Sequence, residues 1–118
     1  MPAKLLEALV RQQPGAAVID LQGEIDAVAA PALNAAYAEA EQSNPEVILL
    51  NFSDVDYINS TGIALIVGLL AKARAAHRRL IVCGLSEHYV EIFQITRLAD
   101  FMTIFPSEAS ALEGAGSQ

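Results

Sequence analysis

The chain has 118 residues, of which 53% are hydrophobic and 18% charged. This composition predicts one compact domain that buries roughly 65% of the surface of its unfolded chain. Seven Lys and Arg against fourteen Asp and Glu give a net charge of -7, which disfavours direct binding to nucleic acid or to an anionic membrane. The longest apolar run, from Gly62 to Ala71, is shorter than the ~20 residues that span a bilayer. We therefore expect a cytoplasmic protein without membrane insertion.

The first part of the chain predicts an antiparallel hairpin followed by a helix. Residues 4–13 fit either a helix or a strand by their pattern, Pro14-Gly15 predicts a turn, and residues 16–21 predict a strand. Residues 22–26 are expected to leave that strand. Residues 31–42 predict a helix with proline in its first turn. The expected core face of this helix consists of Leu33, Ala36, Tyr37 and Ala40.

The middle of the chain predicts a strand, a loop and a second helix. Residues 47–50 are apolar and partly β-branched, as in a strand that is buried on both faces of a parallel sheet. Residues 51–59 are polar, which favours a loop at the carboxyl end of that strand. An apolar helix then continues to Arg74, and either Ser60 or Asn59 is expected to cap its N-terminus.

The last part of the chain predicts two more strands separated by a helix. Residues 80–83 form a buried strand that ends in Cys83, a lone cysteine typical of a small buried hydrophobe in a reducing compartment. Residues 86–98 predict a helix, residues 102–105 a short strand and residues 106–112 a closing helical turn.

This alternation of strands and helices indicates an α/β fold. We expect a mostly parallel central sheet of four to five strands, an antiparallel N-terminal hairpin arm and about four helices. One domain should span residues 1–112, and residues 113–118 should form a flexible tail.

The sequence argues against an enzyme. Gly62 follows Ser60 by two residues, as in the nucleophile elbow of hydrolases, but Ile58 occupies the place of the preceding glycine and no histidine follows Asp100. No glycine-rich phosphate loop is present, and the acids have no metal-loop spacing. We expect no catalytic residue, no metal and no cofactor. A weaker alternative is nucleotide binding at the N-terminus of the second helix, where backbone N–H groups attract anions.

The second helix has almost no polar face in its first half. Its apolar residues are Ile63, Leu65, Ile66, Val67, Leu69 and Leu70. Two interpretations remain open: the helix is packed on all sides with Ser60 as a mere cap, or part of it faces a partner or a second copy in a homodimer. Basic residues cluster near the end of this helix, where they complement its dipole or form a binding patch. They are Lys72, Arg74, Arg78 and Arg79.

Three segments together resemble a known family. Gly23–Asp26, followed by Pro31–Leu33, is similar to a G-E-[IL]-D segment, and Tyr57–Ile63 is similar to a phosphorylation segment with D-S-[ST]-G-[IL]. Ile92–Leu98 is similar to a late F-x-[IL]-[ST]-G-L stretch. In this order and at these intervals the chain resembles the STAS domain, in particular the bacterial anti-sigma factor antagonists.

The resemblance implies a binding protein rather than an enzyme. It implies that the unphosphorylated domain sequesters an anti-sigma factor that is also a serine kinase of the GHKL type, and that a PP2C-type phosphatase reverses the phosphorylation. The implied phosphoacceptor is Ser60, with Thr61 as the less favoured alternative. The residues expected to contact the partner are Asp26, Asp54, Asp56, Asn59, Ser60, Thr61, Gly62 and Ile63. The alternative is an unswitched STAS scaffold or a transporter-associated subunit.

Two positions depart from the family pattern. Asn59 stands where regulated antagonists commonly have Asp, so the site lacks one charge that the kinase partner would meet. Arg97 stands where glycine is common, and we expect the turn there to use another conformation or to shift by one residue.

Overall fold

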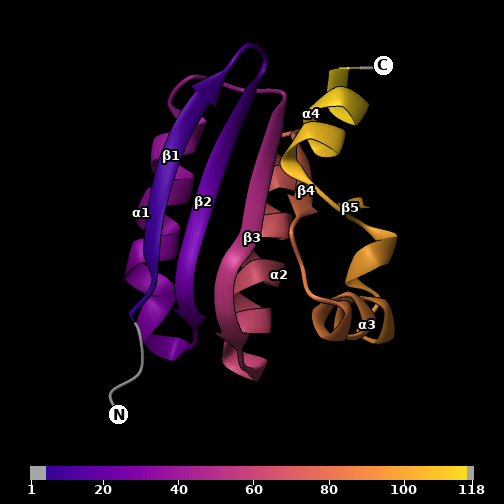
Figure 1. Ribbon diagram of the computed structural model, residues 1–118. Coiled ribbons are helices and arrows are strands. Elements are labelled where there is room, and N and C mark those ends of the chain that lie inside the picture. Colours follow the sequence, from indigo (N-terminus) through magenta and orange to yellow (C-terminus); the bar gives the residue numbers. More distant parts are fainter. Residues whose placement is uncertain (1–4, 117–118) are drawn as a thin grey trace.

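A five-stranded sheet, whose strand order follows the chain, organises the molecule (Figure 1). The computed structural model describes residues 5–116. The strands are β1 (Glu7–Gln13), β2 (Ala16–Ile25), β3 (Val47–Ile58), β4 (Arg79–Cys83) and β5 (Ile104–Phe105). β1 pairs with β2 antiparallel, and the other neighbours pair in parallel. The predicted mostly parallel sheet with a hairpin arm is confirmed, and the ambiguous first segment is a strand.

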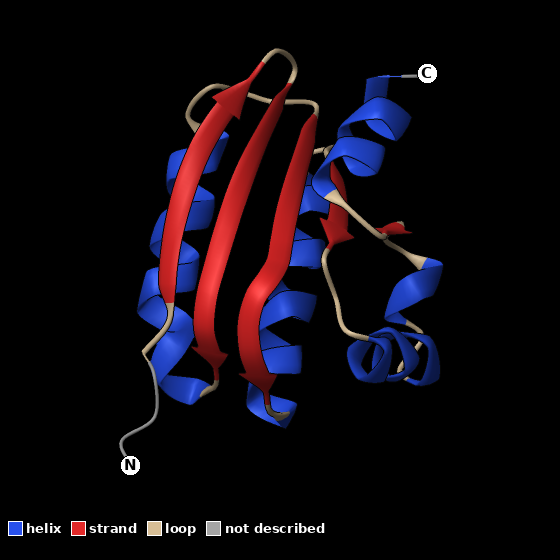
Figure 2. Cartoon of the chain, in the orientation of Figure 1, coloured by secondary structure: helices blue, strands red, loops and turns tan. Residues whose placement is uncertain are grey.

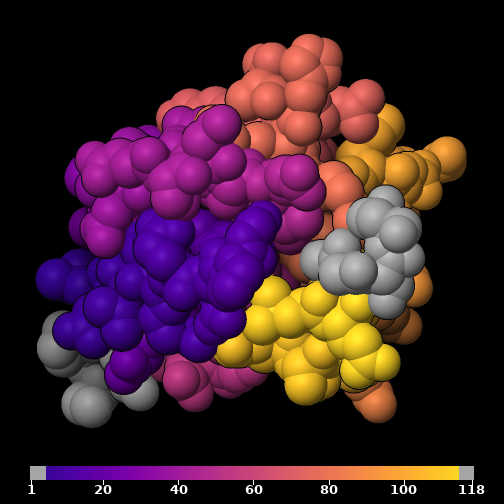
Figure 3. All heavy atoms as spheres, turned by 90° about the horizontal axis from the view of Figure 1, so that it is seen from above, coloured from indigo at the N-terminus to yellow at the C-terminus, as the bar shows by residue number. Residues whose placement is uncertain are grey.

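The helices cover the two faces of this sheet unequally (Figure 2). They are α1 (Ala30–Glu41), α2 (Ser60–Ala75), α3 (Glu87–Ile95) and α4 (Glu108–Gly116), with 3-10 turns η1 (Ala27–Ala29) and η2 (Leu98–Asp100). Because β2, β3 and β4 are parallel neighbours in chain order, crossovers of the usual hand place α1 and α2 on one face. Figure 3 shows α4 in yellow on the opposite side of the molecule from α1 and α2.

Two apolar cores result from this arrangement. On the larger side, side chains such as Ile19, Leu50 and Ile66 are fully buried between the sheet and the helices α1 and α2. The predicted core face of α1 is confirmed, because all four of its residues are buried. On the smaller side, Ala111 of α4 packs over strand residues that include Leu49. Cys83 lies in this smaller core, and its burial raises the pKa of its thiol to about 11.

Strands β2 and β3 extend further than the sequence predicts. Residues 22–25 and 51–58, expected as an exit and a loop, are strand, and their pairing continues across register shifts to Ile25 opposite Ile58. The neighbouring β4 ends with Cys83 opposite Asn51. Beyond that point β3 lies at an edge of the sheet, so its polar side chains reach solvent although the backbone stays extended.

The C-terminal elements differ in smaller ways. Ser86 caps α3 as predicted, with its hydroxyl accepting from the backbone N–H of Tyr89. Arg97 follows α3 with φ 70° and ψ 10°, so it adopts the left-handed conformation itself, and the expected change of the turn is wrong. Helix α4 continues to Gly116, beyond the turn predicted to close at Leu112. The rest of the expected tail, residues 117–118, lies outside the described residues.

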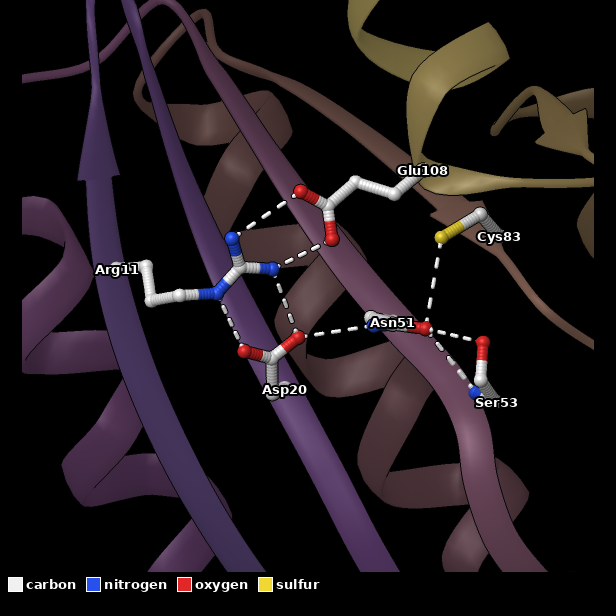
Figure 4. Close-up of polar contacts among 6 residues, drawn as sticks. All are labelled: Arg11, Asp20, Asn51, Ser53, Cys83 and Glu108. Carbon is white, nitrogen blue, oxygen red and sulfur yellow. Dashed lines mark hydrogen bonds and ion pairs between the residues drawn. The ribbon is translucent and has the colours of Figure 1, made fainter.

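A polar network on the smaller side joins α4 to the sheet (Figure 4). The guanidinium of Arg11 on β1 donates to both Asp20 of β2 and Glu108 of α4. Asn51 of β3 donates from Nδ2 to Asp20 at 2.9 Å. The pKa of Asp20 lies below its usual value, mainly because Arg11 donates hydrogen bonds to its carboxylate. This network links three strands and a helix far apart in the sequence.

Candidate functional site at the start of helix α2

Asn59 connects the end of β3 to the start of helix α2. Its backbone is extended, with φ -94° and ψ -177°, and its side-chain Oδ1 accepts from the N–H of Gly62 at 2.8 Å. Its carbonyl accepts the first helical hydrogen bond, from the N–H of Ile63 at 3.0 Å. Asn59, rather than Ser60, is therefore the N-cap of α2.

Ser60 is the first residue of α2, and its side chain is exposed together with that of Thr61. Because the Asn59 side chain occupies the capping position, the Ser60 hydroxyl is not part of the cap. The backbone N–H groups of the first turn give this end of the helix a partial positive charge. A hydroxyl here is accessible from solvent and lies where a negative group is tolerated.

The start of α2 packs directly against the end of β2. The N–H of Asn59 donates to the carbonyl oxygen of Ile25 at 3.2 Å. A Cβ at Gly62 would lie 2.1 Å from the same oxygen, so only glycine fits this close approach. Asp26 follows Ile25 directly and is half-buried, with its carboxylate accepting from the N–H of Val28 at 3.0 Å. Asp26 therefore lies next to the residue whose carbonyl contacts the helix start.

Asp54 and Asp56 do not lie in a loop at the helix start. Both are exposed residues of β3. Asp54 pairs in register with Gln22, and with Leu9 it borders a surface hollow of about 520 Å³ on the sheet. At about 3.3 Å per residue, Asp54 lies roughly 13 Å before the last residue of β3. The predicted loop is wrong because these carboxylates belong to a strand.

Three further residues lie close to the helix start, although the sequence does not point to them individually. Val28 of η1 and Tyr57 of β3 are 66% and 50% exposed, respectively, which is high for large apolar side chains. The hydroxyl of Tyr89 on α3 accepts from the N–H of Ile58 at 2.9 Å. Val28 follows the Gly23–Asp26 segment and Tyr57 opens the phosphorylation-like segment. Both residues therefore lie next to sequence motifs that could have pointed to them. Tyr89 is 31 residues away from Ile58 in the sequence, and no motif pointed to it.

Helix α2 has a buried face and an exposed apolar face. Ile66, Leu69, Leu70 and Ala73 are buried against the sheet, whereas Val67 is 45% exposed. Lys72 and Arg74 lie in the last turn, which fits the interpretation through the helix dipole. Arg78 has a structural role, because it donates to the carbonyl of Pro45 at 2.8 Å.

Within residues 5–116, no group of three or more His, Cys, Asp and Glu side chains is arranged to hold a metal ion. In the same range, no helix combines the length and the apolar character needed to cross a membrane.

The sequence of this chain matches a known protein family. A family model described as the STAS domain matches residues 7–111. The chain belongs to the STAS domain family. It is similar to the anti-sigma-B factor antagonist of Listeria monocytogenes, with 33% identity over 73% of this chain and 75% of the relative. It is also similar to the anti-sigma-B factor antagonist of Staphylococcus aureus, with 30% identity over 73% of this chain and 80% of the relative.

The fold of this STAS domain also matches solved structures. A crystal structure of an anti-sigma factor antagonist from Mycobacterium paratuberculosis superimposes with a TM-score of 0.80. That match covers 92% of each chain at 24% identity. At this identity the likeness establishes the fold, and the family itself follows from the match over residues 7–111.

Proposed function

We propose that this STAS domain is an anti-sigma factor antagonist, a protein-binding module that sequesters an anti-sigma factor through the start of helix α2. The observation that carries the proposal is the exposed Ser60 at a helix N-terminus that Asn59 already caps. Val28 and Tyr57 present apolar surface near it. The relatives from Listeria monocytogenes and Staphylococcus aureus, at 33% and 30% identity, bear the name anti-sigma-B factor antagonist, which supports the same class of partner here.

The binding is switched by phosphorylation of Ser60, with Thr61 as the less favoured acceptor. A phosphate adds about 1.5 to 2 negative charges and three acceptor oxygens. The positive end of α2 tolerates these charges, so the fold survives. A partner packed on this surface has to desolvate the phosphate next to Asp26, and a hundredfold weaker complex needs only about 2.8 kcal/mol. No large conformational change is required.

The partner in this proposal is an anti-sigma factor with serine kinase activity of the GHKL type, and a PP2C-type phosphatase restores the binding form. The contact surface comprises Asp26, Asn59, Ser60, Thr61, Gly62 and Ile63, with Asp54 and Asp56 further along β3. The module itself catalyses nothing in this scheme. Its action consists of occupying the partner.

A second candidate is an unswitched STAS subunit of a scaffold or of a transporter-associated assembly. Asn59 favours it, because a neutral residue stands where regulated antagonists commonly have Asp. In that case the surface around α2 binds its partner permanently, and Ser60 is a helix residue without regulatory role.

Phosphate transfer and partner binding decide between these candidates. The protein is incubated with its cognate kinase and ATP, and the product is mapped by mass spectrometry. We expect phosphate on Ser60, its loss in Ser60→Ala, its retention in Thr61→Ala, and binding by Ser60→Asp that is weaker by about a hundredfold. Absence of phosphate on Ser60 together with full binding by Ser60→Asp contradicts the switch and supports the second candidate.

A further inference from the structure

An apolar groove lies on helix α2 toward the end opposite Ser60. It has a volume of about 330 Å³ and runs between α2 and the segment that follows α3. We call it the α2–η2 groove and define it by Val67 and Arg74 on the helix side and Arg97, Leu98 and Phe101 on the other side. Leu98 is only 4% exposed, so the groove is backed by the packed core.

The rim of the α2–η2 groove exposes large apolar side chains. Phe101 is 55% exposed and Val67 is 45% exposed. They face the same hollow from two separate elements, whereas isolated exposed hydrophobics scattered over a surface need no explanation. Apolar walls from two elements around one hollow are typical of a surface that a partner covers.

The groove is also basic, although the protein as a whole has a net charge of -7. The guanidinium of Arg74 lies 5.2 Å from the centre of the Phe101 ring, and Arg97 stands on the opposite rim. Arg97 pairs with Asp100, while the ion pairs found within residues 5–116 do not include Arg74. The charge complementary to this groove is therefore negative.

The backbone at Arg97 adopts a conformation that is unfavourable for arginine. Its φ of 70° lies in the left-handed region, which is roughly 1 to 2 kcal/mol unfavourable for a residue with a Cβ. Glycine ends helices at this position without that strain. Arg97 nevertheless stands at the rim of the groove, where its guanidinium donates to Asp100 at 2.6 Å.

We propose that the α2–η2 groove is a second docking point for the same partner, which inserts an apolar side chain flanked by carboxylates. This inference rests on the proposed function. At about 1.5 Å per residue, Val67 lies roughly 10 Å and Arg74 roughly 21 Å from Ser60 along α2. One interface of ordinary size covers both. The groove binds independently of Ser60 phosphorylation, so it adds affinity to both forms of the protein.

The test measures the affinity of the full chain for the cognate anti-sigma kinase, without ATP, by calorimetry. We expect Val67→Asp and Arg74→Glu each to weaken binding by about tenfold or more, corresponding to ~1.4 kcal/mol. Arg74→Glu should also reduce the salt dependence of the affinity. Ala109→Asp is the matched control, because Ala109 is exposed on α4, which packs on the opposite side of the sheet from α2. It should bind like the unchanged protein.

Arg97→Gly should change stability and partner binding in opposite directions. The substitution should raise the thermal midpoint by relieving the left-handed strain and still weaken binding several-fold. A residue with a purely structural role cannot produce both effects.

The outcomes separate this inference from the proposed function. If Ser60→Asp loses binding while Val67→Asp and Arg74→Glu bind normally, the groove proposal is overturned and the proposed function stands. If the unchanged protein does not bind the kinase, both are overturned. If the groove variants bind weakly and Ser60→Asp binds normally, the groove stands and the switch falls.

Discussion

At the scale of single residues, Asn59 and Ser60 divide two tasks between them. The sequence alone allowed either residue to cap α2, whereas the structure gives the cap to the amide of Asn59. A capping oxygen is engaged with the helix backbone, and its modification would remove that bond. Since Ser60 is released from capping, it can gain and lose a phosphate without changing how the helix begins.

This division predicts different effects of two neighbouring substitutions. Asn59→Ala should lower the free energy of unfolding by about 1 kcal/mol, because the N–H of Gly62 loses its acceptor. Ser60→Ala should change it by less than about 0.5 kcal/mol, as for an exposed side chain outside the cap. Urea denaturation followed by circular dichroism measures both. Equal losses for the two variants would mean that Ser60 shares the cap.

The lowered pKa of Asp20 makes the stability of the fold sensitive to acid. Its hydrogen bonds from Arg11 lower its pKa in the folded protein, whereas in the unfolded chain the pKa is about 3.9. The folded state therefore binds fewer protons in this range. The resulting stabilisation is complete above the unfolded pKa and is lost as the pH falls through the lower, folded pKa.

In Asp20→Asn, stability should be lower at neutral pH and should decline less steeply below about pH 4 than in the unchanged protein. The effect is modest, because both side chains of the pair remain about one-third exposed to solvent. Thermal melts at a series of pH values compare the two proteins. Identical acid slopes would show that the ion pair does not contribute.

At the scale of elements, glycine has opposite consequences at two positions of α2. A Cβ at Gly62 would lie 2.1 Å from the Ile25 carbonyl oxygen, whereas a Cβ at Gly68 meets nothing within 4 Å. Gly62→Ala has to push the helix start away from β2, and we expect a loss of about 2 kcal/mol or more. Gly68→Ala should stabilise the helix by about 0.5 to 1 kcal/mol.

Gly62→Ala also tests whether the position of the helix start matters for the phosphorylation of Ser60. Displacement of the helix start moves Ser60 relative to Asp26, so Gly62→Ala should also slow its phosphorylation by the cognate kinase. Denaturation curves and phosphate incorporation are measured together. Full stability and an unchanged rate in Gly62→Ala would contradict the close approach to Ile25.

The elements also show what the sequence could and could not predict. The face of α1 was predictable residue by residue, because a helix between a sheet and solvent repeats its apolar positions every three to four residues. Strand β3 was predicted too short. Beyond Asn51 it loses its β4 neighbour and crosses two register shifts, and its polar, irregular sequence pattern resembles that of a loop.

The site shows the same limits. The helix start and Asp26 were predictable from local segments and from the family resemblance. The contact of Tyr89 with Ile58 was not, because its two partners are 31 residues apart in the sequence. The left-handed conformation of Arg97 was missed because glycine, rather than arginine, is the usual sign of it.

At the scale of the whole molecule, the smaller core depends on one helix. Ala111 of α4 is fully buried over Leu49 and Cys83, while Ala109 on the same helix is exposed. Ala111→Asp buries an unpaired carboxylate or detaches α4, and we expect a loss of about 3 kcal/mol. Ala109→Asp should change stability by less than about 0.5 kcal/mol.

The thiol of Cys83 reports on the cover that α4 provides. In the folded protein its burial raises its pKa to about 11, so it should react very slowly with a thiol reagent at pH 8. Ala111→Asp should react faster, and Ala109→Asp should react like the unchanged protein. Equal rates for all three proteins would mean that α4 does not shield this core.

The strand order β1-β2-β3-β4-β5 has a consequence for how the chain folds during its synthesis. Each strand can join a sheet edge already in place as the chain emerges from the ribosome, with no need to insert between earlier strands. Helix α4 follows every strand, so one side of the nascent sheet stays bare until synthesis has passed it. During that interval Leu49 and Ile81, which belong to the core that α4 later completes, stay exposed to solvent.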